Sequence, residues 1–273
     1  MPSSRAFTLH GVRIEICSRD VSIESRLLDY LGRIDGGRAE FHFLLNVTRD
    51  PVVYEREAWG PEFSVSKSRY KLGEGRGCLY VGDCVPLTSC LADILRKILP
   101  KRGMATYHAA CVARRNEGTL IFGAPSAGKS TMALSLLERG YDFLSDDIVF
   151  VDARLLVLAF PTEAKVDSME YYPEFNGYSQ EARYIDVLAW GARIRSTAVP
   201  TTLIFLRKGS AMSFREIDRK QSLVNTLLSA DHELGDPRVI FDNSASLIHT
   251  SKCYELTLTD DKRDEIAEVA GCI

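Results

Sequence analysis

Several features that would assign this chain of 273 residues to a particular class of protein are missing from its sequence. No apolar run is long enough to cross a bilayer, and the first residues are not followed by the apolar stretch of a secretory signal. We therefore expect a cytoplasmic protein without a membrane partner. No stretch is rich in lysine and arginine, and the formal net charge is -3, which argues against a nucleic-acid partner. There are also no internal repeats and no low-complexity tract.

The seven cysteines include no Cys-x-x-Cys pair, and their odd number and short spacing give no case for a disulfide framework. Cys78, Cys84 and Cys90 recur every six residues, a spacing that invites a metal-site interpretation. No histidine or further cysteine lies nearby to complete a tetrahedral zinc site. We therefore expect reduced, mostly structural thiols, as in cytosolic proteins.

What is present fits a soluble globular α/β protein, with 45% hydrophobic and 26% charged residues. The pattern predicts a β-rich region over residues 1–100 and an α/β domain over residues 101–273. In the first region, polar and apolar residues alternate at 12–16, and 41–45 and 78–81 are strand-like, which favours a small antiparallel sheet. A helical stripe over 87–99 ends this region.

The second half predicts strands and helices in alternation. Strands are expected at 107–113, 119–122, 143–151, 155–160, 202–206 and 254–258; helices are expected at 130–138, after a cap at Asp218, at 237–249 and from about 259.

The most informative segment is residues 123–130, which fit the pattern G-x-x-x-x-G-K-[ST]. Two glycines let the backbone curl so that successive N–H groups point into one concavity that holds phosphates. Lys129 then reaches the β- and γ-phosphates, and the Ser130 hydroxyl can bind Mg²⁺. An apolar strand before the loop and a helix after it are the context that this motif requires. The sequence thus predicts a nucleotide site, whose residues are Gly123, Ala124, Pro125, Ser126, Ala127, Gly128, Lys129, Ser130 and Thr131.

Two adjacent acids, Asp146 and Asp147, follow at the end of an apolar strand, one helix beyond the loop. Phosphoryl transfer needs a hard oxygen ligand for Mg²⁺ and a base for the acceptor hydroxyl. The pair suits both needs, although Asp-Asp also favours a plain solvated turn.

Four of these segments together resemble the catalytic domain of the HPr kinase/phosphorylase family. They are the histidine segment beginning at His108, the stretch from Gly118 to Thr131, the helix end Leu136-Leu-Glu-Arg-Gly140, and Ser145-Asp146-Asp147. The resemblance covers about residues 101–152 and weakens afterwards. The segment up to Lys101-Arg102-Gly103-Met104 also resembles the smaller HPr-kinase-like serine kinases found beside peptide natural-product genes.

The resemblance implies a P-loop kinase core of the phosphoenolpyruvate-carboxykinase/HPr-kinase type, which uses ATP and Mg²⁺ to phosphorylate a serine hydroxyl. Carried over by position, Lys129 and Ser130 hold phosphate and metal, and His108 lies close to the phosphate site. Asp147 is then a metal ligand and Asp146 the base, an assignment that the adjacent positions leave open to exchange. The bifunctional enzymes form hexamers, which makes a homo-oligomer an expectation here.

The chain also departs from that family. In place of the Glu-Ile-Arg-Gly-Leu-Gly signature tied to phosphorylase activity, it has Phe160-Pro-Thr-Glu-Ala-Lys-Val-Asp167, so phosphorolysis is doubtful. A basic residue should neutralise charge in the transition state. Lys165 and Arg183 are the candidates by position, and Arg193, Arg195 and Arg207 are the alternatives.

Three further features have two interpretations each. His108 either takes part in the chemistry or is a half-buried histidine on a strand. Glu163 either assists the metal or is a surface carboxylate. The aromatic segment 169–178 either covers the site or accepts a peptide, or it is a small hydrophobic cluster beneath a loop.

The leading hypothesis is a serine kinase whose acceptor is a small protein or peptide, such as a ribosomal peptide precursor. One alternative is a nucleotide-binding regulator without catalysis, although such a protein would not need a base. The other is a kinase of a small-molecule hydroxyl, because the fold does not fix the acceptor.

Overall fold

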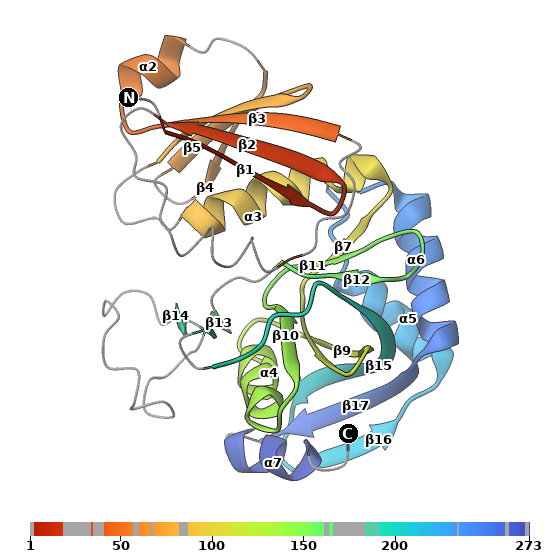
Figure 1. Ribbon diagram of the computed structural model, residues 1–273. Helices are drawn as coiled ribbons and strands as arrows, with labels where there is room; N and C mark the ends of the chain where they lie inside the picture. Colours follow the sequence, from red (N-terminus) through yellow and green to blue (C-terminus); the bar gives the residue numbers. More distant parts are fainter. Residues whose placement is uncertain are drawn as a thin grey trace. The chain divides into compact units, whose positions relative to one another are not determined.

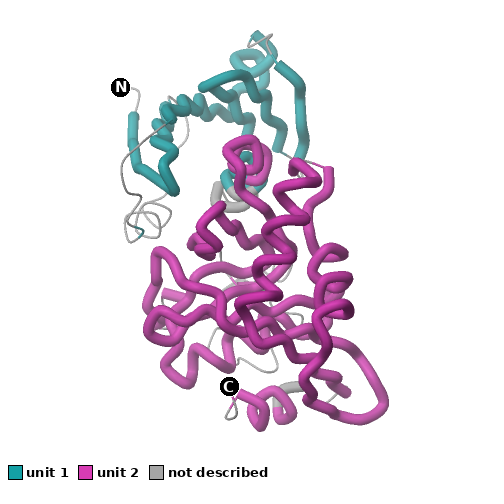
Figure 2. The backbone as a smooth tube through the Cα atoms, turned by 90° about the vertical axis from the view of Figure 1, so that its right-hand side faces the viewer, with its two compact units in different colours: residues 1–95 teal, residues 96–273 magenta. Residues whose placement is uncertain are grey.

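The computed structural model describes residues 3–18, 34, 41–56, 60–65, 68–81, 87–160, 164–165, 184–185, 187–188, 191–233, 235–259, 262–270 and 273. The chain divides into two compact units, residues 1–95 and 96–273, which are coloured separately in Figure 2. The functional division into regions 1–100 and 101–273 stays a prediction. No helix in the described part of the chain is both long and apolar enough to cross a membrane.

Unit 1 contains a six-stranded sheet in the order β1-β2-β3-β6-β5-β4. Its elements are β1 (Ser3–Leu9), β2 (Val12–Ser18), β3 (Phe41–Thr48), α2 (Pro51–Arg56), β4 (Glu62–Val65), β5 (Ser68–Gly73), β6 (Arg76–Tyr80) and α3 (Leu87–Ile98). The expectation of an antiparallel sheet is wrong in part, because β3 runs parallel to both β2 and β6. Parallel neighbours need a long connection, and residues 19–40 between β2 and β3 supply one.

Helix α3 confirms the helical stripe that the sequence predicts. Its buried side chains include Cys90, Leu91 and Ile94, which recur at the spacing of one helix face. The Tyr70 hydroxyl on β5 donates a hydrogen bond to the Asp93 carboxylate on this helix. The helix therefore belongs to the packed core of unit 1 over most of its length.

Unit 2 contains a nine-stranded sheet in which β10-β8-β9-β15-β12-β11-β7 form one path, and β17 pairs with β15 and β16. The strands of the unit are β7 (Ala105–Tyr107), β8 (Ala109–Arg114), β9 (Glu117–Gly123), β10 (Asp142–Ser145), β11 (Val149–Val151), β12 (Val157–Leu158), β13 (Ala164–Lys165), β14 (Tyr184–Ile185), β15 (Thr197–Lys208), β16 (Ser213–Glu216) and β17 (Lys252–Leu258). The helices are α4 (Lys129–Glu138), α5 (Arg219–Leu228), α6 (Pro237–Thr250) and α7 (Lys262–Val269). The α/β class is thereby confirmed.

The centre of unit 2 is the parallel pairing of β9, β15 and β17. Helices α4 and α7 lie near each other, α5 packs beside α6, and the two pairs lie on different sides of the sheet (Figure 1). The rings of Phe122 on β9 and Phe205 on β15 stack with centroids 5.1 Å apart. In open α/β sheets, ligands bind at the carboxyl ends of the parallel strands. Strand β9 ends at Gly123, so the 123–130 loop begins at that edge.

Two predicted strands are each broken into two in the structure. The expected strand 107–113 is interrupted at His108, because β7 pairs with β11 while β8 pairs with β9 and β10. The backbone N–H of His108 instead donates to the Ser229 carbonyl at 2.8 Å. The expected strand 143–151 is interrupted by the turn between β10 and β11. Both interruptions carry predicted site residues out of the sheet.

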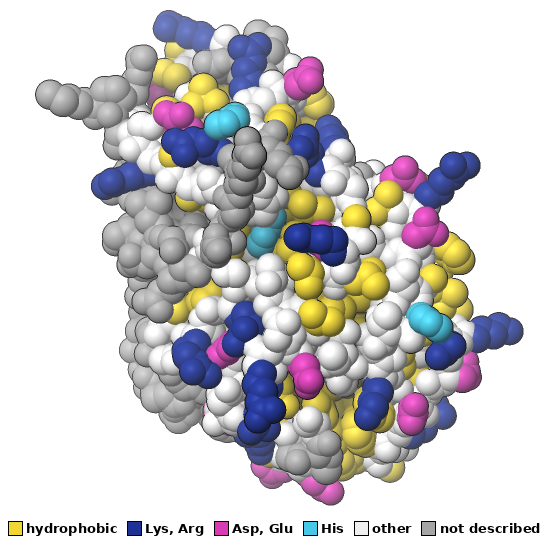
Figure 3. Space-filling view, turned by 45° about the vertical axis from the view of Figure 1, so that its right-hand side comes forward, with side chains coloured by type: hydrophobic (Ala, Val, Ile, Leu, Met, Phe, Trp, Pro, Cys, Tyr) yellow, Lys and Arg dark blue, Asp and Glu magenta, His cyan; other side chains and the backbone are white. Residues whose placement is uncertain are grey.

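Helix α5 begins where the sequence predicts its cap. The Asp218 side chain accepts a hydrogen bond from the backbone N–H of Gln221 at 2.9 Å. Asp236 caps α6 in a similar way by accepting from the N–H of Arg238 at 2.8 Å. These caps satisfy donors that would otherwise have no partner within the helix. Large hydrophobic side chains exposed on the two helices are Val224, Leu228 and Phe241. Figure 3 shows hydrophobic side chains gathered on the face that is turned to the viewer.

Candidate active site

The 123–130 loop joins β9 to α4, so the predicted order of strand, loop and helix is confirmed. Two of its residues have left-handed backbone conformations, Ser126 with φ 59° and Gly128 with φ 106°. Such residues turn successive backbone N–H groups toward one side, which makes a concavity for an anion. Gly123, the other glycine of the motif, has little room for a side chain. A Cβ there would lie 3.1 Å from the Cβ of Ala127 and 3.2 Å from the Leu206 carbonyl oxygen. The loop therefore has the backbone form that a phosphate site requires.

Lys129, at the first turn of α4, is only 8% exposed. Its Nζ donates to the carbonyl oxygens of Gly123 at 2.9 Å and Ala124 at 3.2 Å, and lies 3.1 Å from His108 Nε2. These three acceptors match the three N–H bonds of an ammonium group. Because Nε2 of His108 then accepts, the proton of a neutral imidazole belongs on Nδ1.

The Ser130 hydroxyl donates to the Asp146 carboxylate, with 2.7 Å between Oγ and Oδ2. Asp146 is 1% exposed, so this contact is sheltered from water. Serine hydroxyl and carboxylate oxygens are ligands that Mg²⁺ accepts. The structure thus brings one acid of the pair directly to the last residue of the loop motif.

Asp147 points to a different partner, because the chain turns sharply at this residue. Its φ is 70°, and the N–H of Ile148 donates across it to the Asp146 carbonyl at 2.9 Å. A hydrogen bond between residues i and i+2 across a residue of positive φ is the pattern of a γ-turn, which is rare and strained. Ser145 supports the turn, since its Oγ lies within hydrogen-bond distance of the carbonyls of Ile148 and Phe160. Strain of this kind gathers at functional sites.

His108 lies between the loop and Asp147. Its Nδ1 is 2.9 Å from the Asp147 carbonyl oxygen and 3.1 Å from the carboxylate oxygen Oδ1. Because Nε2 accepts from Lys129, Nδ1 has the N–H. This N–H can donate to the carbonyl oxygen and to the carboxylate oxygen of Asp147. His108 is exposed and lies between β7 and β8, so the expected placement on a strand, half-buried, is wrong, and its part in the chemistry stays a prediction. His108 links the lysine of the loop to the second acid.

His108 lines two pockets. The first, of ≈ 360 Å³, is lined by Gly123, Ala124 and Pro125 of the loop together with Phe205, Arg207 and Asn225. The second, of ≈ 400 Å³, is lined by Asp147, Thr106, Asp231 and Glu233, among others. Tyr107 also borders the second pocket, and burial raises the pKa of its hydroxyl to about 12. Leu228 and Ser229 are shared by both pockets, so His108 stands at a boundary between two cavities.

Arg207 is the basic side chain that the structure brings to the loop pocket. Its Nε lies 2.6 Å from Glu255 Oε2, and Glu255 also binds Nη2 of Arg215 at 2.6 Å. Glu255 is only 5% exposed, so its carboxylate is a fixed anchor for the two guanidinium groups. The sequence patterns did not single out Glu255. A charged residue within a largely buried strand such as β17 indicates a partner of opposite charge.

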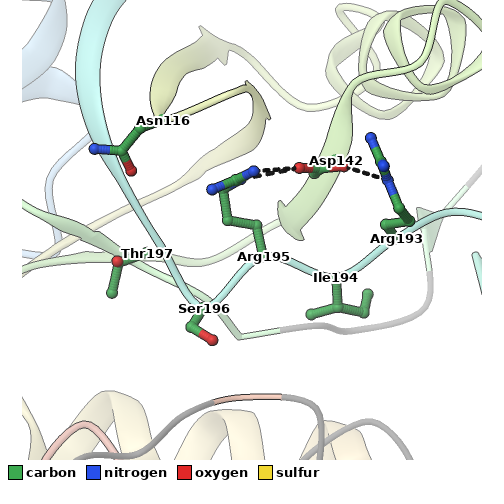
Figure 4. Close-up of a pocket in the computed structure, with 7 residues that line it drawn as sticks. All are labelled: Asn116, Asp142, Arg193, Ile194, Arg195, Ser196 and Thr197. Carbon is green, nitrogen blue, oxygen red and sulfur yellow. Dashed lines mark hydrogen bonds and ion pairs between the residues drawn. The ribbon is translucent and has the colours of Figure 1, made fainter.

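Arg193 and Arg195 lie at the other end of β9, away from the loop. Both bind the buried carboxylate of Asp142, Arg193 through Nε at 2.9 Å and Arg195 through Nη2 at 2.8 Å (Figure 4). Their pocket also contains Asn116, which precedes the first residue of β9, whereas the 123–130 loop follows the last. These two arginines therefore hold the start of the central sheet rather than the candidate site.

Several predicted residues lie outside the part of the chain that the structure describes. Arg183, Glu163 and the aromatic segment 169–178 are among them, and so is the side chain of Lys165, whose backbone pairs with Tyr184. Cys84 is outside as well, whereas Cys78 and Cys90 are buried thiols. Within the described ranges, no group of three or more His, Cys, Asp and Glu side chains could hold a metal ion. Ser130 and Asp146 would hold Mg²⁺ only together with phosphate oxygens and water, the manner that Mg²⁺ favours.

Comparison with known proteins gives a result of limited extent. No family model matches the chain. A stretch of 65 residues, 24% of the chain, is 38% identical to the HPr kinase/phosphorylase of Lactobacillus acidophilus. This stretch spans only 20% of the length of that relative. The similarity thus supports a likeness to HPr kinases and leaves activity, substrate and partners as proposals.

Among solved structures, the chain is similar to the Hpr(Ser) kinase/phosphatase from Coxiella burnetii, with a TM-score of 0.36 and 15% identity. The match covers 61% of this chain and 91% of that one. The α/β class rests on the strands and helices themselves.

Proposed function

We propose that this protein is an HPr-kinase-like serine kinase of the P-loop type, which transfers the γ-phosphoryl group of Mg-ATP to a hydroxyl on a small protein or peptide. The observation that carries the proposal is the connected set of contacts from Lys129 through His108 to Asp147, beside the Ser130–Asp146 contact. A protein that only binds nucleotide has no need for a base on the far side of the loop lysine.

The contacts support a distribution of roles between the two acids that is the reverse of the one carried over by position. The Ser130–Asp146 contact favours Asp146 as the partner of Ser130 in holding Mg²⁺. The contact of Asp147 with His108, and its exposed side chain, favour Asp147 as the base. When bound, Mg²⁺ would neutralise charge on the phosphate oxygens.

The remaining residues would act by position and charge. The N–H groups of the 123–130 loop and Lys129 would hold the β- and γ-phosphates. Arg207, fixed by Glu255, would add positive charge near the γ-phosphate, where charge increases during transfer. Its place in the loop pocket supports Arg207 over Arg193 and Arg195.

The reaction can be written with each atom accounted for. The hydroxyl proton of the acceptor moves to the Asp147 carboxylate as the hydroxyl oxygen forms a bond to the γ-phosphorus. The bond from that phosphorus to the β,γ-bridging oxygen breaks, and its electron pair leaves on ADP. Transfer needs the attacking and leaving oxygens in line, so the acceptor must approach from the side of His108 and Asp147.

The proposal is tested by incubating the full chain with γ-labelled ATP, Mg²⁺ and serine peptides. We expect label on peptide serine, and we expect Lys129→Ala to abolish transfer while the circular dichroism spectrum stays unchanged. Label on a metabolite added in place of the peptide would instead identify a small-molecule kinase. Tight nucleotide binding without turnover on any acceptor would identify a regulator, and normal turnover in Lys129→Ala would refute the role of the loop. The cytoplasmic location, the homo-oligomer and the lack of phosphorolysis remain predictions.

A further inference from the structure

The second pocket beside His108 contains chemistry that the phosphate site does not use. We name it the acceptor pocket and define it by Thr106, His108, Asp147, Leu228, Asp231 and Glu233, which line it. Its volume of ≈ 400 Å³ lies within the range of small-ligand sites and suits a few side chains rather than a whole protein surface.

The pocket lies on the side of His108 from which an acceptor would approach. Lys129, the residue that reaches the β- and γ-phosphates in this motif, contacts Nε2 of the imidazole. Asp147, the proposed base, contacts Nδ1 on the other edge of the ring. A hydroxyl bound in the acceptor pocket would therefore lie beside Asp147, which lines it.

The charges around the pocket are mainly negative. Its lining has three carboxylates, on Asp147, Asp231 and Glu233, and one guanidinium, on Arg96. Arg96 is bound to Asp231, so these two charges largely neutralise each other. Glu233 is exposed at the edge of the pocket, where it can meet a positive group of a ligand. A ligand with a positive charge beside its hydroxyl would be attracted, and one with a negative charge would be repelled.

Thr106 gives a second, independent indication of a polar ligand. The residue is 4% exposed, and its Oγ1 has no hydrogen-bond partner within the described ranges. Its backbone carbonyl is already used by the N–H of Asp231 at 2.9 Å. A buried hydroxyl without a partner costs free energy, and a polar group of a bound ligand would remove that cost.

Leu228 gives the pocket an apolar border, because its side chain is 78% exposed and lines the cavity. An extended peptide could lay an aliphatic side-chain stem on this residue while its polar groups face Thr106 and Glu233. A lysine or arginine has both an aliphatic stem and a positive end.

We propose that the acceptor pocket selects peptides in which a lysine or arginine lies next to the phosphorylated serine. The inference rests on the proposed function, because it names the acceptor class of that same site. Glu233 is the specificity residue, and Thr106 holds the peptide by a hydrogen bond that does not depend on charge.

The experiment measures the binding of two fluorescent peptides to the full chain with Mg²⁺ and a non-hydrolysable ATP analogue. One peptide has arginine on both sides of a central serine, and the other has glutamate at the same positions. We expect the arginine peptide to bind at least about 10-fold more tightly, with a preference that falls as salt rises. Glu233→Gln should reduce the preference about 2- to 5-fold. Thr106→Val should weaken both peptides alike and leave the preference unchanged.

Glu216→Gln is the matched control, because Glu216 is an exposed glutamate on β16 that does not line the acceptor pocket. Equal binding of the two peptides, failure of both to bind, or an equal effect of Glu216→Gln and Glu233→Gln would overturn the inference. Phosphoryl transfer to the same peptides tests the selection by charge separately from the proposed kinase activity. Equal transfer to both peptides would refute the selection by charge but leave the proposed kinase activity standing. Selective binding without transfer in the presence of ATP would refute the proposed kinase activity.

Discussion

Exchanging the two adjacent aspartates for asparagine, one at a time, separates the metal-holding role from the base. Asparagine keeps the size of the side chain and removes its charge. Asp147 is 64% exposed at its side chain, so Asp147→Asn should leave the fold unchanged. Asp146 is buried, but an asparagine there can still accept the hydrogen bond of Ser130 through its amide oxygen.

The two variants should change different quantities, kcat in Asp147→Asn and the Mg²⁺ requirement in Asp146→Asn. A positioned general base contributes about 10²- to 10⁴-fold, so Asp147→Asn should lower kcat by that factor. At about 1.4 kcal/mol per decade, this corresponds to about 3–5 kcal/mol of transition-state free energy. Asp146→Asn should instead raise the Mg²⁺ concentration needed for half-maximal rate by about 10- to 100-fold. Excess Mg²⁺ should then restore much of the turnover.

The assay is the initial rate of transfer at saturating ATP and acceptor, measured across a series of Mg²⁺ concentrations. Ser130→Ala should shift the Mg²⁺ dependence in the same direction as Asp146→Asn. The opposite pattern, a metal shift from Asp147→Asn and a loss of kcat from Asp146→Asn at all Mg²⁺ concentrations, would refute our distribution of roles.

Three further predictions follow from other parts of unit 2. Arg207→Met should lower kcat by about 10-fold or more in transfer assays. Arg193→Met is the matched control at the far end of β9 and should leave kcat unchanged. Burial raises the pKa of Tyr107 from 10.0 to about 12, so the free energy of unfolding should fall between these pH values by about 1.4 kcal/mol per unit. Denaturant titrations should show this decline weakened in Tyr107→Phe. Burial also raises the pKa of the Cys111 thiol, so iodoacetamide should modify the partly exposed Cys17 before Cys111, as peptide mass mapping can test.

The parts of the fold that sequence reasoning predicted well are those with local causes. The strand before the loop, the loop and α4 follow from an apolar run, two glycines and a helical stripe within some twenty residues. The cap of α5 follows from an aspartate at the first position, and the structure has that hydrogen bond. Each of these signals acts between residues that are close along the chain.

The parts that it did not predict depend on residues far apart in the sequence. The alternation from 107 to 113 is continuous, and the break at His108 arises because β7 and β8 find different partner strands. The parallel pairing of β2 with β3 likewise joins segments that are far apart in the sequence. Among the arginines, spacing could not separate Arg207 from Arg195, because the choice depends on which end of β9 each one meets.

The distribution of roles that we propose for the acid pair rests on one backbone feature. Along a regular strand, adjacent side chains point to opposite faces of the sheet. If the strand had continued through Asp146 and Asp147, neighbouring residues on the two faces would have held both side chains in place. The turn with φ 70° at Asp147 instead leaves Asp146 buried against Ser130 and carries Asp147 out to His108. A metal ligand benefits from a fixed, sheltered position, whereas a base must meet an acceptor that arrives from solvent. The strained turn thus gives two identical side chains different environments, and on this ground our proposal assigns the metal to Asp146 and the proton to Asp147.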